Sequence, residues 1–404
     1  MAALERMEGG ITAVPGILAA GLHCGMKVSG KKDLALIYSS TPSVAAGVFT
    51  TNRIVGAPVK VSREHLKGGV AQAIVASSGN ANVATGEQGV KDAREMAQLV
   101  AQHLRIPPTH VLVASTGIIG QPLPMEKIRA GIPKLVKALS PQGGRAAAEG
   151  IMTTDTQRKE AALRVEIGGR AVTLGGIAKG AGMIYPHLAT MFCFMATDAA
   201  LTREALDQVL RRAVEQSFNR IVVDGDRSTS DTVLLLANGL AENRPLAKGD
   251  RQLHAFQQGL EALTQRLALM LVQDGEGATK LVEVRVRGAR SRRDALTAAR
   301  AIATSLLVKT ALAGGDPNWG RIIAALGASG AQVQEEKVAI FYGEEAVTEG
   351  GQLRPGVHWE RVKEAVRGKE VLIQVDLGLG SGQAQVWTSD LTEEYIKINA
   401  RYTT

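Results

Sequence analysis

Two hydrophobic periodicities alternate along the chain. Apolar residues spaced by three, four and seven positions predict helices around residues 93–104 and 206–213. Short apolar runs bounded by polar or glycine residues predict buried strands at residues 73–75, 111–113, 233–236, 338–341 and 371–375. Alternation of apolar and polar residues over 163–167 predicts a half-exposed strand. The pattern therefore indicates a mixed α/β or α+β chain.

Two segments carry more specific local predictions. Residues 294–312 are rich in Ala and Leu, and they predict one long helix that ends before Gly314 and Gly315. The glycine-rich residues 378–382 lie between two strand-like runs. This arrangement predicts a hairpin turn rather than a phosphate-binding loop.

Composition bounds the size and class of the protein. The chain has 404 residues, of which 45% are hydrophobic, and this length favours two domains. No run approaches the ~20 apolar residues of a membrane span. The apolar stretch 11–22 contains Pro15 and lacks the basic flank of a signal peptide. We therefore expect a soluble, cytoplasmic protein with no membrane partner.

The charged and metal-binding residue types narrow the chemistry further. The formal net charge is +8, which raises nucleic acid or an acidic substrate as a partner. The densest basic run, residues 285–293, has no interleaved aromatic residue, so we interpret it as solvated surface and expect no nucleic-acid partner. Cys24 and Cys193 are too few for a disulfide framework or a four-ligand zinc site, and the seven histidines are scattered. We expect no bound metal.

The common catalytic motifs are missing: the sequence has no P-loop, no G-x-S-x-G and no H-E-x-x-H. What remains is a set of small, polar, glycine-punctuated segments far apart in the sequence. They occupy residues 78–82, 115–120, 153–156, 179–183, 189–191, 224–226, 274–280 and 316–321. Each segment taken alone is most simply a turn.

Together and in this order, these segments resemble the glutamate N-acetyltransferase family of arginine biosynthesis, also called ornithine acetyltransferase. The resemblance extends from Gly9 to Ala400, which is nearly the whole chain. It is most specific in residues 179–191, 274–280 and 316–321.

The resemblance implies a precursor that cleaves itself between Ala189 and Thr190. The products, an α chain of residues 1–189 and a β chain of residues 190–404, would stay associated, commonly as an α2β2 heterotetramer. The new N-terminal threonine would take the acetyl group of N2-acetyl-L-ornithine and give it to L-glutamate, which leaves L-ornithine and N-acetyl-L-glutamate. Some members also accept acetyl-CoA as donor, and no other cofactor is implied.

The residue chemistry agrees with this implication. After cleavage Thr190 carries its own α-amine, whose unperturbed pKa of about 7.7–8 lets it accept the hydroxyl proton near neutral pH. By resemblance, Thr116 and Gly117 form the oxyanion hole for the tetrahedral intermediates. The substrate contacts implied by the resemblance are Thr153, Lys179, Thr190, Glu276, Asn399 and Thr404. Among these, Lys179 suits a carboxylate and Glu276 suits an ammonium group.

The resemblance also implies the architecture: an α-β-β-α sandwich over approximately residues 1–280, and a smaller C-terminal α/β domain over approximately residues 281–404. Two other functions stay open at this point. A threonine or serine N-terminal-nucleophile aminopeptidase or amidase would share the acyl-enzyme chemistry but pass the acyl group to water. A basic, non-enzymatic nucleic-acid-binding protein is disfavoured because aromatic stacking motifs are missing.

Overall fold

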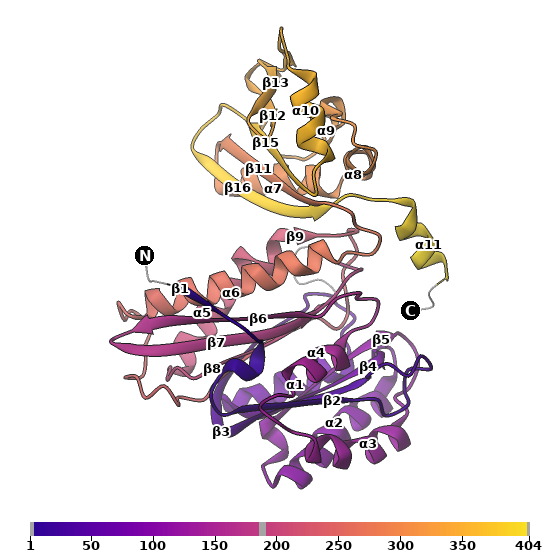
Figure 1. Ribbon diagram of the computed structural model, residues 1–404, viewed down its shortest axis with the longest axis vertical. Helices are drawn as coiled ribbons and strands as arrows, with labels where there is room; N and C mark the ends of the chain where they lie inside the picture. Colours follow the sequence, from indigo (N-terminus) through magenta and orange to yellow (C-terminus); the bar gives the residue numbers. More distant parts are fainter. Residues whose placement is uncertain (1–3, 186–190, 402–404) are drawn as a thin grey trace. The chain divides into compact units, whose positions relative to one another are not determined.

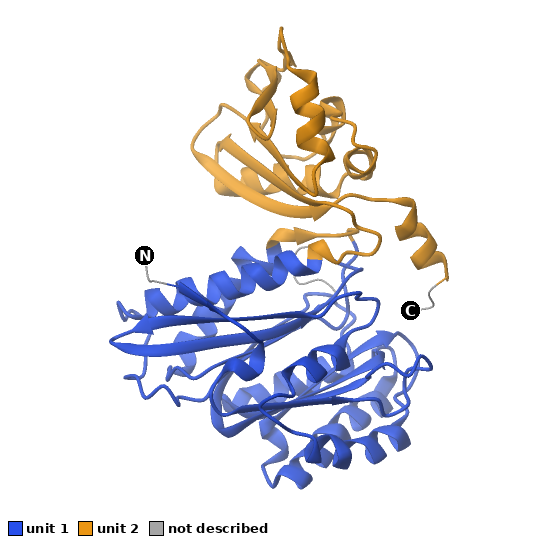
Figure 2. Cartoon of the chain, viewed as in Figure 1, with its two compact units in different colours: residues 1–219, 226–271, 404 blue, residues 220–225, 272–403 orange. Residues whose placement is uncertain are grey.

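The computed structural model describes residues 4–185 and 191–401. The chain forms two compact units, drawn in different colours in Figure 2. Unit 1 comprises residues 1–219, 226–271 and 404, and unit 2 comprises residues 220–225 and 272–403. The expected cleavage site between Ala189 and Thr190, and the expected substrate contact Thr404, lie outside the described residues.

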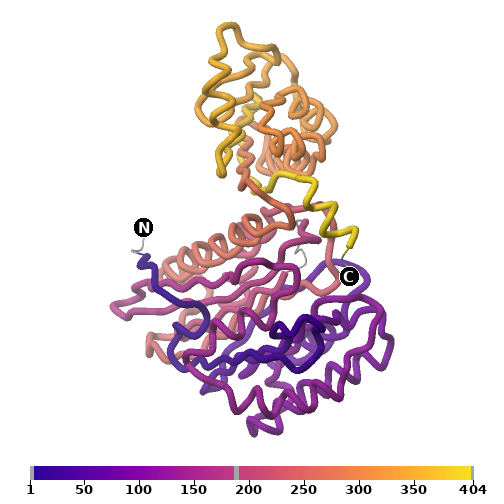
Figure 3. The backbone as a smooth tube through the Cα atoms, turned by 45° about the vertical axis from the view of Figure 1, so that its right-hand side comes forward, coloured from indigo at the N-terminus to yellow at the C-terminus, as the bar shows by residue number. Residues whose placement is uncertain are grey.

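Among the described residues, unit 1 contains a nine-stranded sheet in the order β1-β6-β7-β8-β10-β3-β4-β5, with β2 paired to β3. Its strands are β1 (Leu4–Met7), β2 (Ile17–Leu22), β3 (Leu34–Phe49), β4 (Val70–Asn80), β5 (Val111–Ile118), β6 (Lys159–Ile167), β7 (Arg170–Lys179), β8 (Phe192–Thr197) and β10 (Thr232–Ala237). The long strand β3 pairs with β2 and β4 through its first part and with β10 through its last part. It therefore joins the two halves of the sheet (Figure 1 and Figure 3).

The helices of unit 1 complete a four-layer arrangement. They are α1 (Ala57–His65), α2 (Gly86–Leu104), α3 (Met125–Lys137), α4 (Gly144–Ile151), α5 (Arg203–Gln216) and α6 (Leu253–Gln273), with short 3-10 turns at Ile11–Ala13, Leu66–Gly68, Pro108–His110 and Phe218–Arg220. Helices α1, α2 and α3 pack on the β2 to β5 half, whereas α5 and α6 lie beside the half that contains β6, β7 and β8 (Figure 1). The predicted helices around 93–104 and 206–213 are confirmed as α2 and α5.

The core between the two halves of the sheet shows why they face one another. One cluster joins Ile37 and Ile74 from one half with Ile177, Phe194 and Leu236 from the other, and all five side chains are buried. A second cluster lies on the opposite face of β4 and β5, against α2 and α3. The predicted α-β-β-α sandwich is therefore confirmed: each half of the sheet buries one face against the other half and one face against helices.

Unit 2 is a smaller α/β unit, as the sequence predicted. Among the described residues its seven-stranded sheet has the order β14-β13-β12-β15-β11-β16-β9. The strands are β9 (Ile221–Val222), β11 (Leu281–Ala289), β12 (Ala339–Tyr342), β13 (Glu345–Glu349), β14 (Gln352–Leu353), β15 (Glu370–Asp376) and β16 (Gly382–Ser389). The helices are α7 (Arg292–Thr304), α8 (Leu306–Ala313), α9 (Trp319–Gly327), α10 (Trp359–Arg367) and α11 (Glu393–Arg401), with a 3-10 turn at Glu335–Lys337.

The prediction of a single helix over 294–312 is wrong. This segment forms two helices, α7 and α8, and the chain bends by 56° between them. Ser305 has extended backbone between them, and its side chain accepts a hydrogen bond from the Val308 N–H. Serine competes with helical backbone bonds and favours the N-cap position, which explains the break. The bend lets Lys309 of α8 donate to Thr388 Oγ1 of β16 at 2.9 Å.

The hairpin predicted around 378–382 is also wrong. Strands β15 and β16 both pair with β11, one on each side, so they do not pair with each other. The glycine-rich loop crosses the end of β11, where the Leu379 and Gly380 N–H groups donate to the Gly288 carbonyl at 2.6 and 2.9 Å. A Cβ atom at Gly288 would lie 2.2 Å from Asp376 Oδ1, so the crossing needs glycine there.

No single helix among the described residues is long and apolar enough to cross a membrane. Taken together, α7 and α8 have the length and composition of a span, but the pair carries the sharp bend noted above.

We predict that Ser305→Ala lowers the free energy of unfolding of unit 2 by about 1 kcal/mol, because the first turn of α8 loses its cap. Ser305→Asn, which keeps a capping oxygen, should stay close to the wild type. All three tryptophans, Trp319, Trp359 and Trp387, belong to unit 2, so tryptophan fluorescence during urea unfolding measures this unit. Equal unfolding midpoints for the wild type and the alanine variant would contradict the capping role.

Candidate active site

Thr116 and Gly117 lie at the end of β5, where β5 runs parallel to β4. Thr116 is in register with Ser78, and Gly117 with Gly79. Gly117 has φ +127°, and a Cβ atom there would lie 2.2 Å from the Gly79 carbonyl oxygen. Only glycine fits this close approach of the two strands. The predicted oxyanion pair therefore occupies a backbone geometry that a larger residue would destroy.

Lys179, at the end of β7, contacts Thr116. It is the last residue of β7, only 1% of its surface is exposed, and its Nζ lies 3.5 Å from Thr116 Oγ1. In the β7–β8 ladder Lys179 is in register with Phe192. The chain segment that immediately precedes Phe192 therefore continues from the strand position beside Lys179. This register places the start of β8 beside the lysine that contacts the predicted oxyanion pair.

Asp155 fixes the backbone around these groups. Its Oδ1 accepts hydrogen bonds from the Gly180 N–H and from Lys159 Nζ, both at 2.7 Å, and its Oδ2 accepts one from the Thr153 N–H at 2.9 Å. Asp155 is 3% exposed, and the Lys159 side chain is buried too. One carboxylate thus ties the loop that follows α4 to the start of β6 and to the end of β7. The predicted substrate contacts Thr153 and Lys179 are brought together by this carboxylate.

The electrostatics of Asp155 follow from its two lysine neighbours. Burial by itself would raise the pKa of this carboxyl. The charges of Lys179 and Lys159, with the hydrogen bonds from Gly180 and Lys159, outweigh burial and hold the pKa at about 2. Asp155 is therefore ionised at neutral pH and balances buried positive charge.

A further lysine, Lys27, lies close to the same loop. Its Nζ donates to the carbonyl of Met152 at 2.6 Å and to that of Lys32 at 2.8 Å. Burial, together with the charge of Lys179, lowers the pKa of Lys27 to about 8, although Asp33 opposes the shift. The side chains of Met26 and Lys27 also lie over Gly79, which is in register with Gly117 of the predicted oxyanion pair. Sequence reasoning missed Lys27, since no motif marks it.

In unit 2, the structure brings together the other two described substrate contacts. Glu276 lies in the turn between α6 and β11, and its Oε2 accepts a hydrogen bond from Asn399 Nδ2 of α11 at 2.7 Å. Thr392 Oγ1 donates to the Gly277 carbonyl at 2.7 Å, which holds the start of α11 against the same turn. Two of the expected substrate contacts, 123 positions apart in the sequence, are thus hydrogen-bonded to each other.

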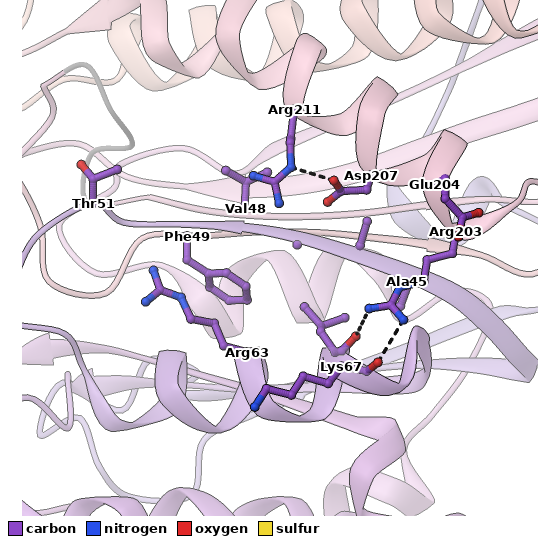
Figure 4. A pocket seen from close by; sticks show the side chains of 13 residues that line it. Ala45, Val48, Phe49, Thr51, Arg63, Lys67, Arg203, Glu204, Asp207 and Arg211 are labelled. Atoms are coloured by element: carbon purple, nitrogen blue, oxygen red, sulfur yellow. Dashed lines mark hydrogen bonds and ion pairs between the residues drawn. The ribbon is translucent and has the colours of Figure 1, made fainter. Parts of the chain in front are cut away.

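Other features of the described residues lie apart from these groups. No group of three His, Cys, Asp or Glu side chains in the described ranges could hold a metal ion. A cavity of about 700 Å³ lies beside the last part of β3 (Figure 4). Two of the arginines that line it already have partners: Arg203 donates to the carbonyls of Leu66 and Lys67, and Arg211 pairs with Asp207. None of the predicted site residues lines this cavity.

Sequence reasoning also missed Asp155, Lys159 and Asp231, which all lie beside predicted site residues. The segment 153–156 did mark the place of Asp155, but the carboxyl itself was given no role. Lys159 reads as an ordinary polar residue at the start of a strand. No sequence motif marks these residues, because Asp155 bonds the distant Gly180 and Asp231 bonds the distant Met191, while Lys159 gains its role through Asp155.

We predict that Asp155→Asn lowers the free energy of unfolding by about 3–5 kcal/mol at pH 7, since it removes the negative charge that faces the buried Lys159 and Lys179. The effect should shrink as the pH falls from about 4 to 2, because protonation then removes the same stabilisation from the wild type. Circular dichroism during urea unfolding measures it. The matched control is Asp207→Asn, which removes an exposed ion pair with Arg211 and should cost below about 1 kcal/mol. Equal losses in the two variants would contradict the role of Asp155.

Known proteins similar to this chain cover its full length. The model of the ArgJ family matches residues 18–404. The chain is 50% identical over 404 residues to the arginine biosynthesis bifunctional protein ArgJ of Symbiobacterium thermophilum, covering 99% of this chain and 100% of that protein. It is 48% identical over 391 residues to the protein of the same name from Geobacter sulfurreducens, covering 97% of this chain and 100% of that protein.

Two solved structures are similar to about half of the chain. One is the arginine biosynthesis bifunctional protein argJ of Bacillus halodurans, with 38% identity and a TM-score of 0.45, over 47% of this chain and 99% of that chain. The other is an ornithine acetyltransferase of Mycobacterium tuberculosis complexed with ornithine, with 39% identity and a TM-score of 0.43, over 46% of this chain and 98% of that chain. The full-length sequence matches decide the family, and the chain belongs to the ArgJ family of arginine-biosynthesis acetyltransferases.

Proposed function

We propose that this enzyme moves the acetyl group of N2-acetyl-L-ornithine to L-glutamate through an acetyl ester on Thr190. The observation that carries the proposal is the 3.5 Å contact between Lys179 Nζ and Thr116 Oγ1. Lys179 is in register with Phe192, the first residue of β8, and Phe192 follows Thr190 by two positions in the sequence. Family membership supports the same reaction.

The chain must first cut itself before Thr190. The hydroxyl of Thr190 attacks the carbonyl of Ala189, and the bond from that carbonyl carbon to the Thr190 nitrogen breaks, which gives an ester and a free α-amine on Thr190. Hydrolysis of the ester then releases the Ala189 carboxylate and restores the Thr190 hydroxyl. That amine then serves as base for the same hydroxyl during transfer. Thr116 and Gly117 stabilise the oxyanion in both reactions, because both pass through a tetrahedral intermediate.

The charges of the described residues suit amino-acid substrates. Lys179 supplies positive charge for a carboxylate. Lys27 lies close enough to Lys179 for the charge of Lys179 to lower the pKa of Lys27. Glu276, held by Asn399, supplies negative charge for an ammonium group. We assign Thr153, Thr190 and Thr404 to the remaining polar contacts of the substrate.

We further propose that acetyl-CoA is a second donor and that no cofactor is needed. The relatives are bifunctional proteins by name, which supports a second donor. The α and β chains are expected to stay together as an α2β2 heterotetramer in the cytoplasm. Mass photometry of the cut enzyme tests the assembly, and N-acetylglutamate formed from acetyl-CoA and glutamate tests the donor.

The deciding experiment offers N2-acetyl-L-ornithine with and without L-glutamate. The proposed transfer produces N-acetyl-L-glutamate with glutamate present. Without it, one acetyl group should accumulate on the chain that begins at Thr190, visible by intact mass. Release of free acetate at the same rate in both reactions would instead identify an N-terminal-nucleophile hydrolase.

We predict that Thr190→Ala abolishes both cleavage and transfer, because one hydroxyl performs both attacks. Thr190→Ser should keep a measurable part of each, since it keeps the oxygen and loses only the methyl group that restricts χ1. Intact mass measures cleavage into residues 1–189 and 190–404, and the acetylglutamate assay measures transfer. An alanine variant that still transfers acetyl groups would show that another nucleophile exists.

We predict that Thr116→Ala lowers kcat by about 10²–10³, with a smaller change in KM, because an oxyanion donor acts mainly in the transition state. Thr116→Ser should recover much of the rate. The matched control is Ser115→Ala: this neighbouring buried residue bonds Ser77 Oγ at 2.8 Å, so its loss should affect stability more than kcat. A Thr116→Ala enzyme altered only in KM would remove Thr116 from the oxyanion hole.

A further inference from the structure

Asp231 is a buried carboxyl that the reaction described above does not use. It lies directly before β10, fully shielded from solvent. Its Oδ1 accepts a hydrogen bond from the Met191 N–H at 3.1 Å. Its backbone carbonyl accepts one from the Thr50 N–H at 3.1 Å, which anchors it to the end of β3. The carboxyl is therefore held against the Met191 N–H.

The second carboxyl oxygen of Asp231 is buried, and no described residue donates a well-aligned hydrogen bond to it, although the hydroxyls of Ser228 and Thr50 lie near the carboxyl. Buried polar atoms nearly always have a partner, so an orphaned carboxyl oxygen calls for an explanation, and a catalytic role is a common one. The position supports such a role. Consecutive Cα atoms are only about 3.8 Å apart. A carboxyl that is hydrogen-bonded to the Met191 N–H therefore acts on the residue that directly follows Thr190 in the sequence.

We propose that the Asp231 carboxyl carries the proton that self-cleavage must move from the hydroxyl of Thr190 to the amide nitrogen of the same residue. This inference rests on the proposed function, because it assigns a proton carrier to the cleavage before Thr190.

The proposed step balances. The bond from Thr190 Oγ to the Ala189 carbonyl carbon forms, and the bond from that carbon to the Thr190 nitrogen breaks. The carboxylic acid of Asp231 gives its proton to the departing nitrogen, and the carboxylate receives the hydroxyl proton. The carboxyl ends as it began, and water then hydrolyses the ester.

The proton state of Asp231 fits this task. Burial raises the pKa of Asp231 to about 8, against the opposing effects of the Met191 N–H, the Ser228 hydroxyl, the Lys179 charge and the Thr50 hydroxyl. The group is therefore mostly a carboxylic acid at neutral pH and is able to donate. Groups whose pKa lies near the working pH are the most effective proton carriers.

The test follows self-cleavage by gel after a short pulse of cell-free translation, in the full chain. Asp231→Asn keeps the acceptor for Met191 but cannot exchange a proton, and it should slow cleavage by about 10²–10⁴. In Asp231→Ala, added formate should restore part of the rate, since it replaces the missing carboxyl. The matched control is Asp198→Asn. Asp198 is a buried carboxyl just beyond the other end of β8, also with a raised pKa, and it accepts from the Thr173 N–H at 2.7 Å. This control should be cut at the wild-type rate.

Thermal unfolding separates a proton carrier from a structural carboxyl. The raised pKa means that the neutral Asp231 stabilises the fold fully below about pH 4, and that this stability is lost as the pH rises towards about 8. Uncut Asp231→Asn should therefore have a Tm at pH 8 equal to or above that of uncut Thr190→Ala. Wild-type cleavage rates in Asp231→Asn, or no rescue of Asp231→Ala by formate, would overturn the inference. A wild-type chain that is never cut would instead overturn the proposed function.

Discussion

The carboxylate of Asp155, buried between Lys159 and Lys179, is the interaction on which the site in unit 1 depends. It accepts bonds from three different segments: the loop after α4, the start of β6 and the turn after β7. Without a counter-charge, two buried lysines would be strongly unfavourable, and Lys179 could not be held near Thr116. The positions of Thr153 and Lys179 are thus consequences of one ionised side chain.

A second constraint is steric and comes from the backbone. Strands β4 and β5 approach so closely that a Cβ atom at Gly117 would lie 2.2 Å from the Gly79 carbonyl oxygen, so a side chain at this position is not tolerated. The approach places Thr116 at a strand end with its side chain turned to Lys179. Preorganised donors of this kind cost no rearrangement during the reaction, which is why a rigid parallel strand pair suits an oxyanion hole.

The sequence was sufficient for features with a local signal and failed where distant segments decide. Helix α2 and the layers of the sandwich could be predicted, because periodic burial and family resemblance mark them. The break at Ser305 could not, since a serine cap inside an Ala/Leu-rich run has little local signal. The loop that crosses β11 depends on Gly288, some 90 positions earlier in the chain. Likewise, Asp155 gains its role only from contacts with Lys159 and Gly180.

Asp155 and Asp231 show how one fold gives two buried carboxyls opposite tasks. Both feel the charge of Lys179, and burial acts to raise the pKa of both. Asp155 also has the charge of Lys159, so it stays ionised and holds structure, whereas at Asp231 burial outweighs the charge of Lys179 and the carboxyl stays mostly protonated at neutral pH. Carboxyls whose environments push their pKa values apart commonly divide structural and proton-transfer roles. The balance between burial and neighbouring positive charge thus decides which carboxyl holds the site and which can carry a proton.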